Sequence, residues 1–264
     1  MAEPAIRCLR QLASIFHLGC GKGKKDTEVL RYKGTKPGKA VKPVTELRIL
    51  CVGDSITVGF LSDQDGGDGN GYRLRLLDDL SQDQIVYAGT EVTGTMKDGY
   101  FAAWSGKTIQ FIADNVGPSL AQNPNIVLVH AGTNDMNSSN AISTEGNDPA
   151  AAAERLGQLI DKIANSCPNA VVLVAMIIGT WDPVQAQRTN QFDALIPGVV
   201  RQRRDAGRQV LAVDFTSFSK KLLRDGVHPT NEGYHVFGDY WYDFVTQIPV
   251  EWIQPPVGND PYRW

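Results

Sequence analysis

The amino-acid sequence predicts an α/β protein in which a parallel sheet lies between two layers of helices. Strand-length runs rich in Val, Ile and Leu recur without strict alternation, which is typical of strands buried on both faces. Helix-length segments separate these runs, and the alternation indicates a doubly wound α/β/α sandwich with right-handed crossovers. The length of 264 residues suffices for one large domain of this class.

Five strands and five helices are expected, in alternating order. The strand-like runs cover residues 48–52, 84–88, 125–130, 170–177 and 209–214. The helical segments cover residues 71–80, 109–115, 149–166, 190–206 and 231–246. Asp148 and Pro149 are typical of an N-cap and a first helical residue, so they fix the start of the third helix. Pro197 is expected to interrupt the fourth helix, and Gly207 to end it.

Composition divides the chain into three parts. Residues 1–46 form a basic N-terminal extension that is expected to be flexible, because residues 21–43 are rich in Lys and Gly. The folded domain is expected over residues 47–248. Residues 249–264 contain four prolines and two tryptophans, which predicts an extended tail over the domain surface rather than a helix.

Charge and apolar patterning exclude several classes of partner. The net charge of −3 gives no reason to expect nucleic acid, and no apolar run is long enough to span a membrane. The N-terminal apolar stretch at 9–19 is interrupted by Arg10, Gln11 and His17, so we interpret it as a short amphipathic helix rather than a signal peptide. An intracellular location is therefore favoured. The four cysteines, Cys8, Cys20, Cys51 and Cys167, form no Cys-x-x-Cys pair, so no structural zinc is expected.

Three short strings follow the first, third and fifth predicted strands. They are Gly-Asp-Ser at 53–55, Gly-Thr-Asn-Asp at 132–135 and Asp-Gly-Val-His at 225–228. The carboxyl ends of parallel strands meet at one edge of a sheet, so the three strings converge there. Each string alone has an ordinary structural explanation: a serine N-cap, a capped turn, or a surface Asp–His pair.

Together the strings supply the groups that acyl transfer needs. Ser55 is a candidate nucleophile, and His228 is a candidate base that Asp225 orients. The Asn134 amide is a candidate donor to a developing oxyanion. Of the other histidines, His130 ends an apolar strand and is interpreted as a core residue.

Two further features are interpreted without catalytic chemistry. His17 falls in the tail, and His235 is expected at a surface or packing position on the last helix. The segment 63–70 is dense in oxygen ligands but departs from the EF-hand pattern. A mobile loop beside the active site is favoured there over a calcium site.

These residues resemble the SGNH hydrolases, also called GDSL-type esterases, over residues 47 to about 246. Ser55, Asn134 and His228 match three of the four residues that give the family its name. Gly94, Gly99 and Gly106 are candidates for the fourth, and Gly106 is chosen because residues 104–109 are similar to the Ser-Gly-x-Thr-Ile block of carbohydrate esterases. Strings at 71–73, 130–135 and 228–234 also resemble carbohydrate esterase family three, which holds acetyl xylan esterases.

The resemblance implies a flavodoxin-like five-stranded fold and a serine esterase without metal or organic cofactor. Ser55 would attack the ester, with His228 and Asp225 completing a triad. The oxyanion hole would comprise the N–H groups of Ser55 and Gly106 and the Asn134 amide. The expected reaction removes acetyl or other short acyl groups from carbohydrate.

Alternatives to this expectation remain open. The chain could be a lipase or thioesterase acting on longer acyl chains, or a non-catalytic binding module. The expected partner is a small-molecule or carbohydrate ester, with the monomer as default and with secretion open through the family resemblance. Candidate sugar-facing aromatics, each of which could instead be packing, are Trp104, Tyr72, Tyr100 and Trp181.

Overall fold

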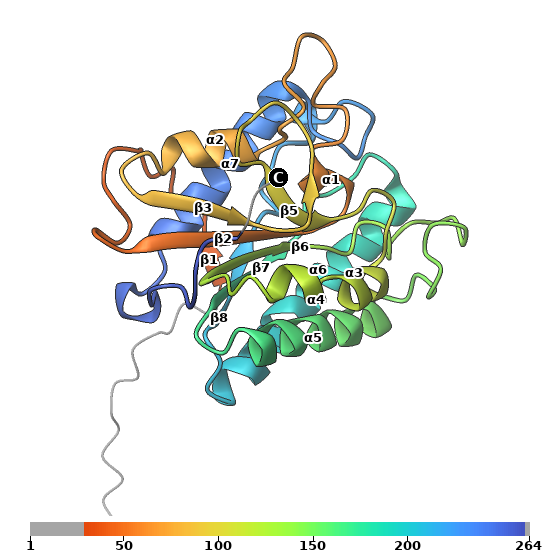
Figure 1. Ribbon diagram of the computed structural model, residues 1–264. Helices are drawn as coiled ribbons and strands as arrows, with labels where there is room; N and C mark the ends of the chain where they lie inside the picture. The colour runs from red at the N-terminus through yellow and green to blue at the C-terminus, as the bar shows by residue number, and fades with distance from the viewer. Residues whose placement is uncertain (1–28, 262–264) are drawn as a thin grey trace, which may run out of the picture.

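The predicted parallel sheet is present, with helices on both of its faces (Figure 1). The computed structural model describes residues 29–261. The strands are β1 (Val29–Arg31), β2 (Glu46–Gly53), β3 (Gln84–Ala88), β4 (Glu91–Val92), β5 (Tyr100–Ala103), β6 (Ile126–His130), β7 (Val171–Met176) and β8 (Val210–Asp214). The helices are α1 (Ser55–Val58), α2 (Arg73–Asp79), α3 (Ile109–Asn115), α4 (Gly117–Leu120), α5 (Pro149–Ser166), α6 (Pro183–Asp205) and α7 (Asn231–Thr246), with short 3-10 helices η1 (Lys220–Leu222) and η2 (Val250–Trp252).

The centre of the sheet is the predicted set of five parallel strands, in the order β3-β2-β6-β7-β8. The expected count of five was too low, because three further strands within residues 29–261 extend the sheet to eight. β1 pairs in parallel with β8, β5 pairs in parallel with the end of β2, and β4 runs antiparallel to β5. These strands have three, four and two residues, too short for a run of apolar residues to reveal them.

Alternate residues of each central strand enter two separate cores. Leu47, Ile49 and Cys51 of β2 pack on the side of α2 and α7, whereas Leu50 and Val52 pack on the side of α3, α4, α5 and α6. The same helices lie on opposite sides of the sheet in Figure 1. Burial on both faces explains why the strands read as unbroken apolar runs.

Two helix boundaries test the capping signals. α5 begins at Pro149 with the Asp148 side chain accepting from the Ala151 N–H, as expected. α6 was expected at residue 190, but it begins at Pro183, where the Asp182 side chain accepts from the Gln185 N–H in the same manner. The helix also continues through Pro197 without a break. Both α5 and α6 therefore begin at an Asp-Pro pair. In this chain such a pair predicts the start of a helix better than an internal proline predicts its end.

The folded domain includes residues before the expected boundary at residue 47. β1 belongs to the main sheet, and Asp243 on α7 accepts from the N–H groups of Lys33 and Thr35. The C-terminal segment lies over the domain as an extended chain, apart from η2, and its Ile253 is fully buried. The interpretations of the 9–19 stretch, His17, Cys8 and Cys20 concern residues outside the described range. Between residues 29 and 261, no helix combines the length and apolarity needed to cross a membrane.

Candidate active site

Ser55 stands where β2 turns into the one-turn helix α1. Asp54 caps this helix, and its side chain accepts from the Ile56 N–H at 3.1 Å. A Cβ at Gly53 would lie 2.3 Å from the His130 carbonyl oxygen and 2.5 Å from Thr57 Oγ1, so glycine is required there. The turn therefore places Ser55 at the carboxyl end of a central strand, with only 6% of its surface exposed.

His228 and Asp225 reach Ser55 from the loop after β8. His228 Nε2 lies 2.8 Å from Ser55 Oγ, and His228 Nδ1 lies 2.8 Å from Asp225 Oδ2. The loop holds its own shape, because Asp225 Oδ1 accepts from the N–H groups of Val227 and His228. Gly226 has a φ of +90°, a left-handed conformation that favours glycine. The structure thus brings together the three residues that the strings at 53–55 and 225–228 supply.

Three ionisable side chains near Ser55 have shifted pKa values. Burial by itself would raise the pKa of Asp225, but the hydrogen bonds from His228 and the Val227 N–H outweigh it and hold the pKa below its ordinary value. Burial raises the pKa of Asp54 to about 6. Burial also lowers the pKa of His130 to about 3, so this histidine is a neutral core residue, as expected.

Asn134 and Gly106 lie on neighbouring loops. Asn134 Nδ2 donates to the Lys107 carbonyl at 2.9 Å, which joins the loop after β6 to the segment containing Gly106. The Trp104 N–H donates to the Gly53 carbonyl, so this segment also lies beside the Ser55 turn. Gly106 has a φ of +74° and open space where a Cβ would project. Four segments of the predicted site therefore meet at one edge of the sheet: the Ser55 turn, the loop 225–228, the Asn134 loop and the Gly106 segment.

Asp135 is the anchor of these loops. Its two carboxylate oxygens accept from the Ile109 N–H at 2.9 Å and from the Arg155 guanidinium at 2.9 Å. Burial raises the pKa of Asp135, against the opposing effects of Ile109 and Arg155. The carboxylate thus connects the loop after β6 to the start of α3 and to the second turn of α5, and it fixes the position of Asn134 beside it.

Sequence reasoning missed two residues next to the site. Arg73 is fully buried and donates to the carbonyls of Thr57 and Val58 at the end of α1, and to Thr93. Phe60 places its ring 4.8 Å from the His228 ring, centroid to centroid. The Gly-Tyr-Arg string at 71–73 contributed to the family resemblance, but it assigned no role to Arg73. No pattern in the sequence indicated Phe60.

The other sequence predictions have mixed outcomes. His235 is exposed, as expected, whereas Tyr72 is fully buried and packs against Phe237, so it faces the core rather than a sugar. The loop at 63–70 lies beside the site, as expected. Two contacts hold it to the domain: Asn231 donates to the Gln64 carbonyl, and Arg224 contacts Asp65. No group of three or more His, Cys, Asp or Glu residues in the described range is placed to hold a metal ion.

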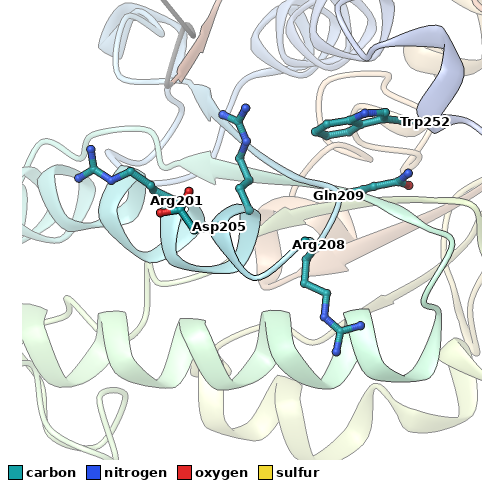
Figure 2. A pocket seen from close by; sticks show the side chains of 7 residues that line it. Arg201, Asp205, Arg208, Gln209 and Trp252 are labelled. Carbon is teal, nitrogen blue, oxygen red and sulfur yellow. The ribbon is translucent and has the colours of Figure 1, made fainter. Parts of the chain in front are cut away.

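A groove of about 530 Å³ begins at Phe60 and runs between the segment 58–69 and the loop 93–95. A second cavity, of about 500 Å³, lies where α6 ends and β8 begins (Figure 2). Figure 2 shows the Arg208 guanidinium pointing away from Trp252, and it donates to the Ala164 carbonyl and to Asn165. Ser55 lies at the other end of the sheet, so the groove and not this cavity adjoins the site. The second cavity is lined by Arg201, Arg204, Asp205, Gly207, Arg208, Gln209 and Trp252.

Comparisons with known proteins identify the family of this chain. Residues 51–236 match the model of the GDSL-like Lipase/Acylhydrolase family. The chain is similar in structure to a Clostridium thermocellum family 3 carbohydrate esterase, with 29% identity, a TM-score of 0.61, and coverage of 76% of this chain and 98% of that chain. A family 3 carbohydrate esterase from Talaromyces cellulolyticus shares the fold, at 22% identity, a TM-score of 0.61, and coverage of 76% and 97%.

A curated relative is also named an esterase. A multidomain esterase from Ruminococcus flavefaciens is 24% identical over an alignment of 235 positions, which covers 75% of this chain and 28% of that protein. The chain spans 59% and 28% of the lengths of the two curated relatives that it matches.

Proposed function

This chain belongs to the GDSL-like lipase/acylhydrolase family of carboxylic ester hydrolases, and we propose that it works through an acyl-serine intermediate on Ser55. The observation that carries the proposal is the continuous contact from Asp225 through His228 to Ser55, with 2.8 Å at each step. These distances lie within the range required of a nucleophile, a base and an orienting acid. We further propose that the ester is a short acyl group on a carbohydrate.

Each residue has a chemical role in this reaction. His228 Nε2 takes the Ser55 proton as Oγ attacks the ester carbonyl, and Asp225 stabilises the imidazolium that forms. The N–H groups of Ser55 and Gly106 and the Asn134 amide donate to the oxyanion. His228 then protonates the leaving alcohol. A water molecule, deprotonated by His228, releases the acid and restores Ser55.

The low pKa of Asp225 suits its role. A carboxylate that stays ionised accepts the Nδ1–H of His228 at any pH at which the imidazole is a useful base. This hydrogen bond fixes the tautomer that leaves Nε2 free to accept the serine proton. The loop hydrogen bonds from Val227 and His228 therefore contribute to catalysis through the charge of Asp225.

Support for a carbohydrate ester comes from the relatives. The structure at 29% identity is named a carbohydrate esterase of family 3, and the relative from Ruminococcus flavefaciens is named a multidomain esterase. The groove beside Phe60 is lined by carboxylates, hydroxyls and an amide, which suit an alcohol component rich in hydroxyl groups.

Hydrolysis of p-nitrophenyl acetate, butyrate and octanoate tests the proposal. We expect the wild type to cleave acetate best, and Ser55→Ala to lose at least about a thousandfold in kcat/KM. Ser81→Ala, an exposed serine after α2, is the matched control and should keep the wild-type rate. Faster cleavage of octanoate would favour a lipase or thioesterase. No cleavage at all, together with no labelling by an organophosphonate, would favour a binding module.

A further inference from the structure

Two exposed aromatic side chains lie against the turn that carries Asp225 and His228. The Phe60 ring packs on the His228 ring and is 43% exposed. Trp181 is 54% exposed, and its indole packs on Gly226, where an added Cβ would lie 2.9 Å from the ring. An exposed aromatic ring needs no explanation when it stands alone. Two such rings against one catalytic turn are a feature of the site.

Hydrogen bonds hold the Phe60 backbone and both the backbone and the indole of Trp181, although the two rings face solvent. The Phe60 N–H donates to the Ser55 carbonyl, and the Tyr234 hydroxyl donates to the Phe60 carbonyl at 2.8 Å. Trp181 donates from its backbone N–H to Gly226 and from Nε1 to the Lys220 carbonyl at 3.0 Å. The indole N–H is therefore already satisfied by the protein. What Trp181 offers to a ligand is a fixed apolar face.

The groove next to Phe60 limits the chemistry of the ligand. Its polar side chains are Asp63, Gln64, Asp68, Thr93 and Thr95, and no Lys or Arg is among the residues that line it. Carboxylates, an amide and hydroxyls bind sugar hydroxyl groups well, whereas the two carboxylates repel an anionic alcohol component. Together with a fixed aromatic face, this lining fits a neutral pyranose rather than a uronic acid or a phosphorylated alcohol.

The two rings reach the turn from loops that follow different strands. Phe60 follows β2 and Trp181 follows β7, with β6 between these strands. They contact different residues of the turn, since Phe60 packs on His228 and Trp181 on Gly226. The site therefore offers two separate apolar faces, which suit a ligand with more than one sugar ring.

We propose that Phe60 and Trp181 are specificity-determining residues that bind sugar rings on the two sides of the esterified ring. This proposal rests on the proposed function and names its substrate class: an acylated neutral oligosaccharide rather than an acylated monosaccharide. Stacking on an aromatic face stabilises each flanking ring without touching the reacting carbonyl. The effect therefore falls on recognition of the alcohol component.

Acetylated xylo-oligosaccharides of one to four units, compared with p-nitrophenyl acetate, test the proposal. For the wild type we expect kcat/KM to rise by at least about tenfold from acetylated xylose to acetylated xylotetraose. Trp181→Leu and Phe60→Leu should each remove most of this rise, because leucine fills the space without a flat face. Trp181→Phe should keep it. Val184→Ala, at an equally exposed apolar residue on α6, is the control and should also keep it.

The outcomes separate the two proposals. A serine-dependent acetylesterase whose kcat/KM is independent of oligosaccharide length would overturn the role of Phe60 and Trp181, while the proposed function would stand. A rise with length that survives Trp181→Leu and Phe60→Leu would overturn it as well. Loss of the rise in those variants, with retention in Trp181→Phe and Val184→Ala, would support it. An enzyme inactive on p-nitrophenyl acetate and on every oligosaccharide would contradict both proposals.

Discussion

The two ends of strand β2 use buried polar groups in opposite ways. At the amino end, Arg48 has 2% of its side chain exposed, and its terminal nitrogens contact Glu46, Asp260 and the carbonyls of Val257 and Gly258. At the carboxyl end, Asp54 is fully buried, and none of the ion pairs in the described range includes it. The amino end holds the C-terminal segment of the chain; the carboxyl end holds Ser55.

This difference explains why the amino end of β2 mainly stabilises the fold and its carboxyl end mainly positions the candidate catalytic residues. Arg48 is stabilised by two carboxylates, so removing it leaves Glu46 without its counter-ion. Asp54 accepts a hydrogen bond from the Ile56 N–H, but burial outweighs this bond and the effects of Thr133 and His228, and it raises the pKa of Asp54. Polar groups at the carboxyl end are therefore kept at some cost to stability, in an arrangement that orders the nucleophile turn.

The largest expected effect is at the carboxyl end of the sheet. Asp225→Asn should lower kcat by about a thousandfold or more, because the amide neither fixes the His228 tautomer nor stabilises the imidazolium. The measurement is kcat for p-nitrophenyl acetate. Asp205→Asn, an exposed carboxylate beside the second cavity, serves as the control and should leave kcat unchanged. A fall of less than about tenfold in Asp225→Asn would contradict the role given to Asp225.

At the amino end of β2 we expect a large effect on stability and a small effect on activity. Arg48→Met should lower the free energy of unfolding by about 4 kcal/mol, since it leaves the half-buried Glu46 carboxylate and several carbonyls without a donor. Its kcat/KM for p-nitrophenyl acetate should stay within twofold of wild type. Arg31→Met is the matched control: its side chain is 76% exposed, so its pair with Asp214 should contribute less than about 1 kcal/mol. Urea unfolding gives both values, and equal losses would remove the distinction.

The smallest expected effect is a pH dependence of stability at Asp54. Its pKa is about 6 in the folded protein against 3.8 ordinarily, so its contribution to stability is present below about pH 4 and is lost as the pH rises through 6. Asn does not titrate, so Asp54→Asn should gain about 3 kcal/mol relative to wild type between pH 4 and pH 7. Urea unfolding across this range measures it. The exposed carboxylate of Asp63 provides a control variant, Asp63→Asn, and a constant difference for Asp54→Asn would refute the assignment.

Much of the fold could be predicted because its signals are local. The five central strands are apolar runs, and α5 begins at the expected Asp148–Pro149 pair. Strands β1, β4 and β5 could not be predicted, since two to four residues carry no periodicity and are stabilised by neighbours distant in sequence. The attachment of residues 33–35 to the domain depends in the same way on Asp243, about two hundred residues away.

The chemical groups of the site could be identified from the chain alone, because the strings at 53–55, 132–135 and 225–228 each follow a recognisable strand. Three features needed the folded molecule: the 2.8 Å contact between Ser55 and His228, the anchoring of the Asn134 loop through Asp135, and the aromatic rings of Phe60 and Trp181 against one turn. Residue type and strand position are local properties of the chain. Distance, burial and exposure are set by packing between segments far apart in it.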